Sequence, residues 1–135
     1  MKVEDLYRSE NILVKKVGGF SQDNLVVSFD SYTDTFYLDR PGFGEDFFLK
    51  NNIDCIHIIP KTNSWYQYAE MNHIMDNLCR VIQEYDQVFT YGASMGGYEA
   101  IRYCRTLNAI AIAIAPQYSI DPKVMPEERR WHEAV

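Results

Sequence analysis

The sequence predicts an α/β protein with three layers, in which helices cover both faces of a mostly parallel sheet of four to five strands. Two observations support this class. Short, strongly apolar segments rich in Val and Ile recur along the chain, as is typical of buried parallel strands. Longer segments between them place apolar residues every three or four positions, as helices do. A length of 135 residues suits a single domain spanning residues 1–135.

The predicted strands are β-branched or apolar runs that stop at Gly, Pro or polar turn residues. They cover residues 24–30, 53–59, 87–91 and 109–115, with a weaker strand at 12–17. The strand at 109–115 alternates Ala and Ile, so one of its faces carries only small side chains and a helix can approach it closely. Strand and helix alternate along the chain, which is the pattern of right-handed βαβ units.

Two helices are expected between these strands. The first runs over residues 65–85 and has Ser64 as its cap, and the second runs over residues 94–107. The first crossover, residues 33–52, contains a turn-rich stretch and a short helix near Phe47. Its many aromatic residues are expected to pack this crossover, although they are also suited to lining a pocket.

Composition limits the functions that this chain can have. Its net charge is −6 and it contains no Lys/Arg-rich run, which disfavours nucleic acid and anionic membranes as partners. We find no secretory signal and no apolar run long enough to span a bilayer. Cys55, Cys79 and Cys104 are widely spaced within apolar patterns, which indicates reduced thiols in the cytoplasm. No metal site and no cofactor are expected.

Residues 91–97, Tyr-Gly-Ala-Ser-Met-Gly-Gly, have the spacing of a nucleophile elbow, G-x-S-x-G, between a predicted strand and a predicted helix. Such a turn is tight enough to present Ser94 above the sheet, and it leaves no space for side chains at Gly92 and Gly96. Gly97 likewise carries no side chain where the helix crosses the strand. The alternative is a simple helix start in which Ser94 only caps.

An oxyanion formed by attack of Ser94 needs hydrogen-bond donors. The N–H of Met95 is the first, because it lies at a helix N-terminus. The second normally comes from the loop after an earlier strand, and the N–H of Asp30 or of Ser31 is the candidate. The alternative is that these two residues form an ordinary turn.

These features resemble the α/β-hydrolase superfamily, and within it a bacterial group with four shared segments. The matching segments are Phe29-Asp-Ser, Trp65-Tyr-Gln, Tyr91 to Tyr98 and Pro116-Gln-Tyr-Ser-Ile-Asp-Pro. The resemblance implies a serine hydrolase acting on an ester or acyl substrate. Some members are associated with glycan modification, which does not define the substrate here.

The superfamily order is Ser, then an acid, then His. Asp121 and His132 follow Ser94 in this order and are the candidate acid and base. Only residues 95–135 follow the serine, whereas two further strand–helix units need roughly 50 residues beyond the last strand. We therefore expect a domain that is incomplete at its C-terminal end. His57 is expected to be buried and hydrogen-bonded in a strand, and His73 to face solvent.

Three interpretations remain open from the sequence. The chain is a fragment of a serine hydrolase, a non-catalytic hydrolase-like module for binding or assembly, or a small working hydrolase completed by His132 or by a second subunit. Strands missing after residue 115 would leave an exposed sheet edge, so we also expect a homo-oligomer unless the C-terminal segment covers that edge.

Overall fold

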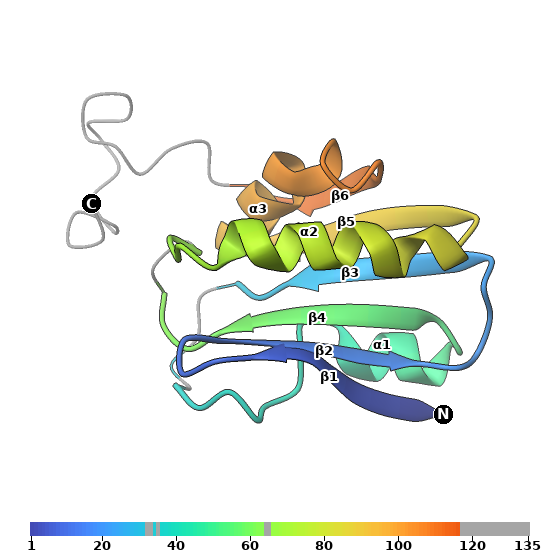
Figure 1. Ribbon diagram of the computed structural model, residues 1–135, viewed down its shortest axis with the longest axis horizontal. Coiled ribbons are helices and arrows are strands. Elements are labelled where there is room, and N and C mark those ends of the chain that lie inside the picture. The colour runs from blue at the N-terminus through green and yellow to red at the C-terminus, as the bar shows by residue number, and fades with distance from the viewer. Residues whose placement is uncertain (32–33, 35, 64–65, 117–135) are drawn as a thin grey trace.

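The computed structural model describes residues 1–31, 34, 36–63 and 66–116 (Figure 1). This part of the chain contains a six-stranded sheet in the order β1-β2-β4-β3-β5-β6. The strands are β1 (Lys2–Arg8), β2 (Ile12–Gly18), β3 (Asn24–Phe29), β4 (Asp54–Pro60), β5 (Gln87–Ala93) and β6 (Ile110–Ile114). The helices are α1 (Glu45–Lys50), α2 (Met71–Val81) and α3 (Met95–Cys104), and a 3₁₀ turn, η1 (Ile82–Glu84), follows α2.

The sheet is mostly parallel, as the sequence predicts. β4, β3, β5 and β6 run parallel, while β1 and β2 form an antiparallel extension beside β4. The weak strand of the sequence analysis is β2. The number of strands was underestimated, because β1 was not expected. Its sequence is largely charged, and among its side chains Leu6 and Tyr7 pack against the core.

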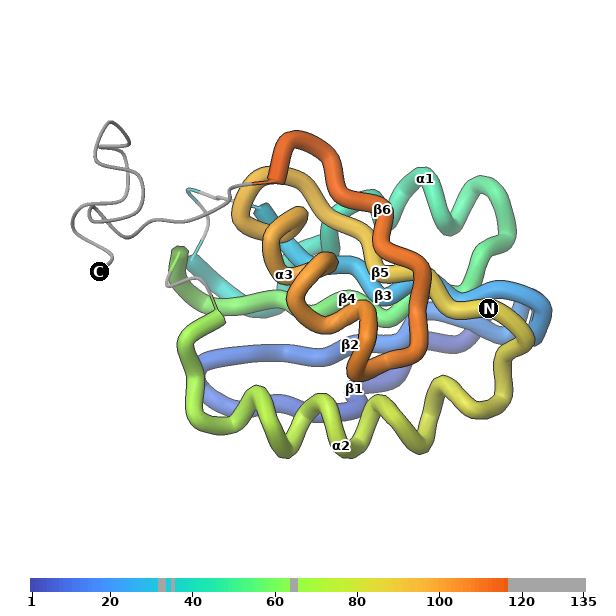
Figure 2. The backbone as a smooth tube through the Cα atoms, turned by 90° about the horizontal axis from the view of Figure 1, so that it is seen from above, coloured from blue at the N-terminus to red at the C-terminus, as the bar shows by residue number. Residues whose placement is uncertain are grey.

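Helices cover both faces of the sheet, because successive strand residues point to opposite sides. Leu25, Val27 and Phe29 of β3 belong to the core beneath α2 and α3, whereas Val26 packs with Phe48 of α1. Figure 2 shows the layers from above, with α1 on one side and α2 on the other. Among the described helices, none is long and apolar enough to cross a membrane.

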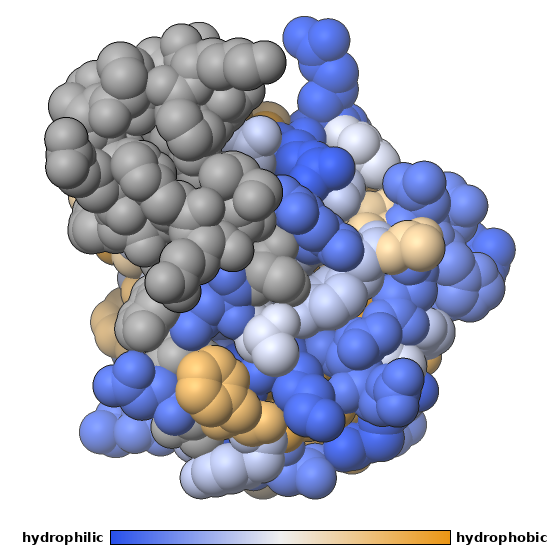
Figure 3. Space-filling model, turned by 90° about the vertical axis from the view of Figure 1, so that its left-hand side faces the viewer, coloured by the Kyte–Doolittle hydropathy of each residue, from blue (hydrophilic) through white to orange (hydrophobic). Residues whose placement is uncertain are grey.

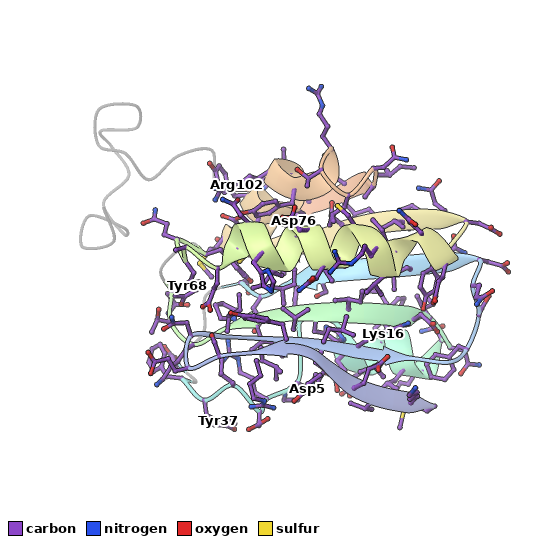
Figure 4. The ribbon with its side chains drawn as sticks, in the orientation of Figure 1. Asp5, Lys16, Tyr37, Tyr68, Asp76 and Arg102 are labelled. Atoms are coloured by element: carbon purple, nitrogen blue, oxygen red, sulfur yellow. The ribbon has the colours of Figure 1, made fainter. Side chains whose placement is uncertain are left out.

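Helix α2 begins at Met71, six residues later than the sequence predicts. Tyr66 has a positive φ of 58°, which a continuing right-handed helix excludes. Ser64 and Trp65, the expected cap and first residue, lie outside the described residues. The buried face of α2 consists of Met71, Ile74, Met75 and Leu78. Its other face is polar and exposed, and includes Asp76, labelled in Figure 4.

The Ala/Ile alternation of β6 separates two faces, as expected. Ala111 is paired with Thr90 and Ala113 with Gly92, on the side where the Thr90 hydroxyl donates to the Ala100 carbonyl of α3. The three isoleucines lie on the opposite face, where Ile112 shares a hollow with Phe47 and Phe48 of α1. These are Ile110, Ile112 and Ile114, and they remain 44–54% exposed.

Candidate active site

Ser94 lies between the end of β5 and the start of α3, at the carboxyl edge of the parallel strands. Its backbone has φ 53° and ψ −116°. This conformation is rare for a residue with a side chain and costs roughly 1–3 kcal/mol, so the surrounding contacts must enforce it. The backbone at Ser94 therefore has the strained geometry that the G-x-S-x-G spacing predicts.

Glycines permit this turn because backbones meet there. A Cβ on Gly92 would lie 2.4 Å from the carbonyl carbon of Gly96, and a Cβ on Gly96 would lie 2.3 Å from the carbonyl oxygen of Phe29. Neither distance is compatible with a side chain. At Gly97 the nearest atoms would be 3.3 Å away, which is tight but tolerable. Helix α3 thus rests directly on the ends of β3 and β5.

The N–H of Ser94 donates to the carbonyl of Ile114 at 3.0 Å, which joins the turn to the end of β6. The Ser94 side chain makes no capping hydrogen bond to α3. The alternative from the sequence, a serine that only caps the helix, therefore lacks the hydrogen bond that would define it. Met95 is the first residue of α3, and amides in a first helical turn have no acceptor within their own helix. Its N–H can therefore donate to an anion at this helix start.

Asp30 and Ser31 follow β3 at the same edge as Ser94. Asp30 is buried, and its carboxylate is fully engaged by protein groups. Arg40 donates to its Oδ2 through Nη2 at 3.0 Å, and the N–H of Phe43 donates to its Oδ1 at 3.0 Å. The side chain of Asp30 is therefore structural, and what this segment can offer a ligand is its backbone.

Arg40 was not selected from the sequence, because it lies in an irregular loop without periodicity. It is 5% exposed. Besides Asp30, it donates to the carbonyls of Tyr37 at 2.7 Å and Pro60 at 2.6 Å. It thereby joins the loop after β3 to the end of β4.

Neither described histidine is placed to serve as a base for Ser94. His57 is fully buried in β4, as expected, but its contacts are long: 3.7 Å from Nδ1 to the Cys55 sulfur and 3.8 Å from Nε2 to Glu45. Nδ1 has the Cys55 sulfur as its hydrogen-bond partner, as the expectation of a hydrogen-bonded histidine requires, whereas Nε2 has none. Burial lowers the pKa of His57 to about 4, which keeps the ring neutral. His73 is exposed on α2, as expected, with Asn77 at 3.2 Å.

Asp121 and His132, the predicted acid and base, lie outside the described residues. Their roles therefore stay predictions. In the described part of the chain, no group of three or more His, Cys, Asp or Glu residues is arranged to hold a metal ion.

Two hollows lie at different places in the fold. A pocket of about 560 Å³ lies at the amino ends of β5 and β6, lined by residues such as Asp86 and Asn108, and so opposite the edge that carries Ser94. A smaller one of about 180 Å³ lies beside α1, between Phe47, Tyr91 and Ile112. Aromatic residues of the first crossover thus both pack and line a hollow: Phe43 stacks on Tyr91 at 5.2 Å, while Phe47 is 62% exposed. The carboxyl edge itself, seen in Figure 3, is mostly hydrophilic where it is coloured.

Glu99 is a second charged residue that the sequence analysis missed. It is fully buried on α3, and neither carboxylate oxygen has a hydrogen-bond partner. The nearest charged group is the half-exposed Arg102, whose Nη1 lies 3.6 Å from Glu99 Oε2. Arg102, in the last turn of α3, is labelled in Figure 4. Burial raises the pKa of Glu99 from 4.5 to about 7.

Glu99→Gln is therefore expected to change how stability depends on pH. The folded protein keeps a proton that the unfolded chain releases above pH 4.5, so stability falls as pH rises towards 7 and then levels off. The variant should match the wild type below about pH 4.5 and exceed it by about 3 kcal/mol at pH 8. Urea unfolding at both pH values measures this. Glu84→Gln, at an exposed position, is the control, and an unchanged pH profile in E99Q would contradict the prediction.

Comparison with known proteins agrees with this architecture. No protein-family model and no curated protein matches the chain. Among solved structures, it is similar to FphF, a fluorophosphonate-binding serine hydrolase of Staphylococcus aureus, solved with substrate bound. The TM-score is 0.60 and the identity 16%, over 99% of this chain and 65% of that one. It is also similar to YeeB, a sugar hydrolase from Lactococcus lactis, with a TM-score of 0.57 and 14% identity, over 87% of this chain and 54% of that one.

The fold is α/β-hydrolase-like. At these identities the likeness concerns the fold alone. The chain spans about two thirds of the length of FphF and about half of that of YeeB.

Proposed function

We propose that this chain is a serine hydrolase-like protein that acts on an ester or acyl substrate, including acyl groups carried on glycans, through Ser94. The observation that carries the proposal is the strained backbone at Ser94, between β5 and α3, with a side chain that makes no capping bond. Strained conformations of this kind cluster at active sites, which makes Ser94 a candidate nucleophile. The hydrolase-like fold of FphF and YeeB supports the same assignment.

In the proposed reaction, Ser94 Oγ attacks the acyl carbon and its proton passes to a base. The negative charge that develops on the carbonyl oxygen is stabilised by the N–H of Met95 and by an N–H of the Asp30–Ser31 segment. The leaving alcohol takes up a proton as the tetrahedral centre collapses, and water then releases the acyl group from Ser94. We propose Asp121 and His132 as acid and base, with a residue of a second subunit or of a longer chain as the alternative base.

A fluorophosphonate probe tests the role of Ser94. We expect it to label the wild type, and Ser94→Ala to abolish labelling, because the probe forms its bond with an activated serine oxygen. An unlabelled wild type would overturn the proposal. His132→Ala and Asp121→Asn, in the same assay, test the two further roles, and unchanged labelling would remove either residue from the site.

The alternative is a non-catalytic hydrolase-like module for binding or assembly. Two observations favour it. Neither described histidine is placed to serve as a base for Ser94, since His57 is buried in β4 and His73 is exposed on α2, and the isoleucine face of β6 is exposed. We propose that a second copy pairs at the β6 edge, whichever function applies. The three cysteines are unpaired, which supports a cytoplasmic location, and we propose neither nucleic acid nor membrane as a partner.

A further inference from the structure

The peptide that joins Asp30 to Ser31 lies directly against the turn that carries Ser94. A Cβ on Gly96, two residues after Ser94, would come within 2.9 Å of the Asp30 carbonyl oxygen. This peptide therefore contacts the first turn of α3. Small movements of the peptide would change its position relative to Ser94 Oγ.

Tyr66 holds the carbonyl end of this peptide. Its hydroxyl donates to the Asp30 carbonyl at 2.9 Å and also lies 3.3 Å from the Ile58 carbonyl. The side chain is 1% exposed, and its ring packs edge-to-face on Phe29. Burial raises the pKa of Tyr66 well above its usual value, so the hydroxyl keeps its proton and remains a donor. Tyr66 has a positive φ and lies before the start of α2, outside the helix.

The side chain of the same residue is held independently. Arg40 and the N–H of Phe43 bind the two carboxylate oxygens of Asp30. Residue 30 is thus fixed both through its carboxylate and through its carbonyl. An ordinary surface turn has no need of two buried side chains for this purpose.

A trans peptide is planar, so fixing its carbonyl also fixes the direction of the N–H on the next residue. We infer that Tyr66 is a positioning residue for the oxyanion site, and that the N–H it orients, that of Ser31, is the second donor beside Met95. This inference rests on the proposed function of Ser94. It selects Ser31 over Asp30, because the Ser31 N–H belongs to the peptide that Tyr66 holds. A preorganised donor accelerates reaction because it needs no rearrangement as charge develops.

Tyr66→Phe tests the inference, since it removes only the hydroxyl. Tyr85→Phe is a matched control, because Tyr85 is also a buried tyrosine. Its hydroxyl donates to Asp54 Oδ2 at 2.6 Å, at the amino end of β4 and so at the opposite end of the strands from Ser94. Both variants should unfold at a lower temperature than the wild type. The rate of fluorophosphonate labelling, measured against probe concentration, separates the maximal rate from half-saturation.

We expect Tyr66→Phe to lower the maximal labelling rate about 10-fold and to leave half-saturation unchanged. Tyr85→Phe should label at the wild-type rate. The amide NMR signal of Ser31 should move in Tyr66→Phe and stay in place in Tyr85→Phe, which supplies a readout that does not depend on reactivity.

The outcomes separate the two proposals. A labelled wild type with equal maximal rates in Tyr66→Phe and wild type would overturn the inference alone. Equal losses in both variants would also overturn it, because they would follow from lower stability. A wild type that is not labelled would overturn the proposed function, and with it the inference.

Discussion

Gly96→Ala is expected to destabilise the fold by about 3 kcal/mol or more, because the new Cβ would overlap backbone atoms. It would lie 2.3 Å from the Phe29 carbonyl oxygen and 2.9 Å from that of Asp30. Backbone cannot rotate aside as a side chain can, so α3 must move away from β3. Urea unfolding measures the loss of stability. The same displacement separates Ser94 from the Asp30–Ser31 peptide, so fluorophosphonate labelling should fall as well.

Gly97→Ala is the matched control for this prediction. It places the same methyl group one residue along α3, where the nearest atoms are 3.3 Å away. Alanine also favours a helix over glycine by about 1 kcal/mol, which offsets the tight contact. We expect a small net change. Equal stabilities for the two variants would show that the contact between α3 and β3 is looser than described.

Arg40→Ala is expected to cost about 3–5 kcal/mol, since it leaves the buried Asp30 carboxylate without its charged partner. Arg40 also satisfies the carbonyls of Tyr37 and Pro60, which would lose their donors. The free energy of unfolding from urea titration measures the effect. Because Asp30 would move, the labelling rate of Ser94 should fall in the same variant.

Two further variants show whether the buried charge causes this loss. The double variant Asp30→Asn with Arg40→Met should recover part of the stability, since no unpaired charge remains. Arg8→Ala removes an arginine with two carboxylate partners, Asp5 and Asp39, on the surface. Its effect should be small, because solvent screens exposed ion pairs. A loss as large for Arg8→Ala as for Arg40→Ala would contradict the argument.

The sheet was largely predictable because its strands carry their own signal. β3 to β6 are apolar runs that end at turn residues, and their boundaries agree with the expected ones to within about two residues. β1 escaped prediction because an edge strand buries few side chains, and its charges resemble those of a loop. The start of α2 was also wrong: the predicted helix included Tyr66, whose backbone has a positive φ and whose hydroxyl binds the Asp30 carbonyl instead.

The candidate site was predictable where geometry depends on neighbouring residues in the chain. Gly92, Ser94 and Gly96 define a tight turn by spacing alone. Arg40 and Asp30 are ten positions apart in the sequence, and no periodicity reveals such a pair. Glu99 was missed for a similar reason: it lies at a position where a charged residue on a short helix would normally face solvent.

The two edges of the sheet differ in chemistry. β1 carries Lys2, Glu4, Asp5 and Arg8, and its register shifts between Asp5 and Tyr7. Charges and bulges of this kind deter strand addition, whereas β6, Ile-Ala-Ile-Ala-Ile, has neither. In the proposed pairing, the β6 edges of two copies would contact each other. The charged β1 edge of each copy would then remain at the outside of the pair. If the proposed pairing at β6 takes place, growth would stop at two copies, because the described strands offer no second unprotected edge for an open-ended fibre.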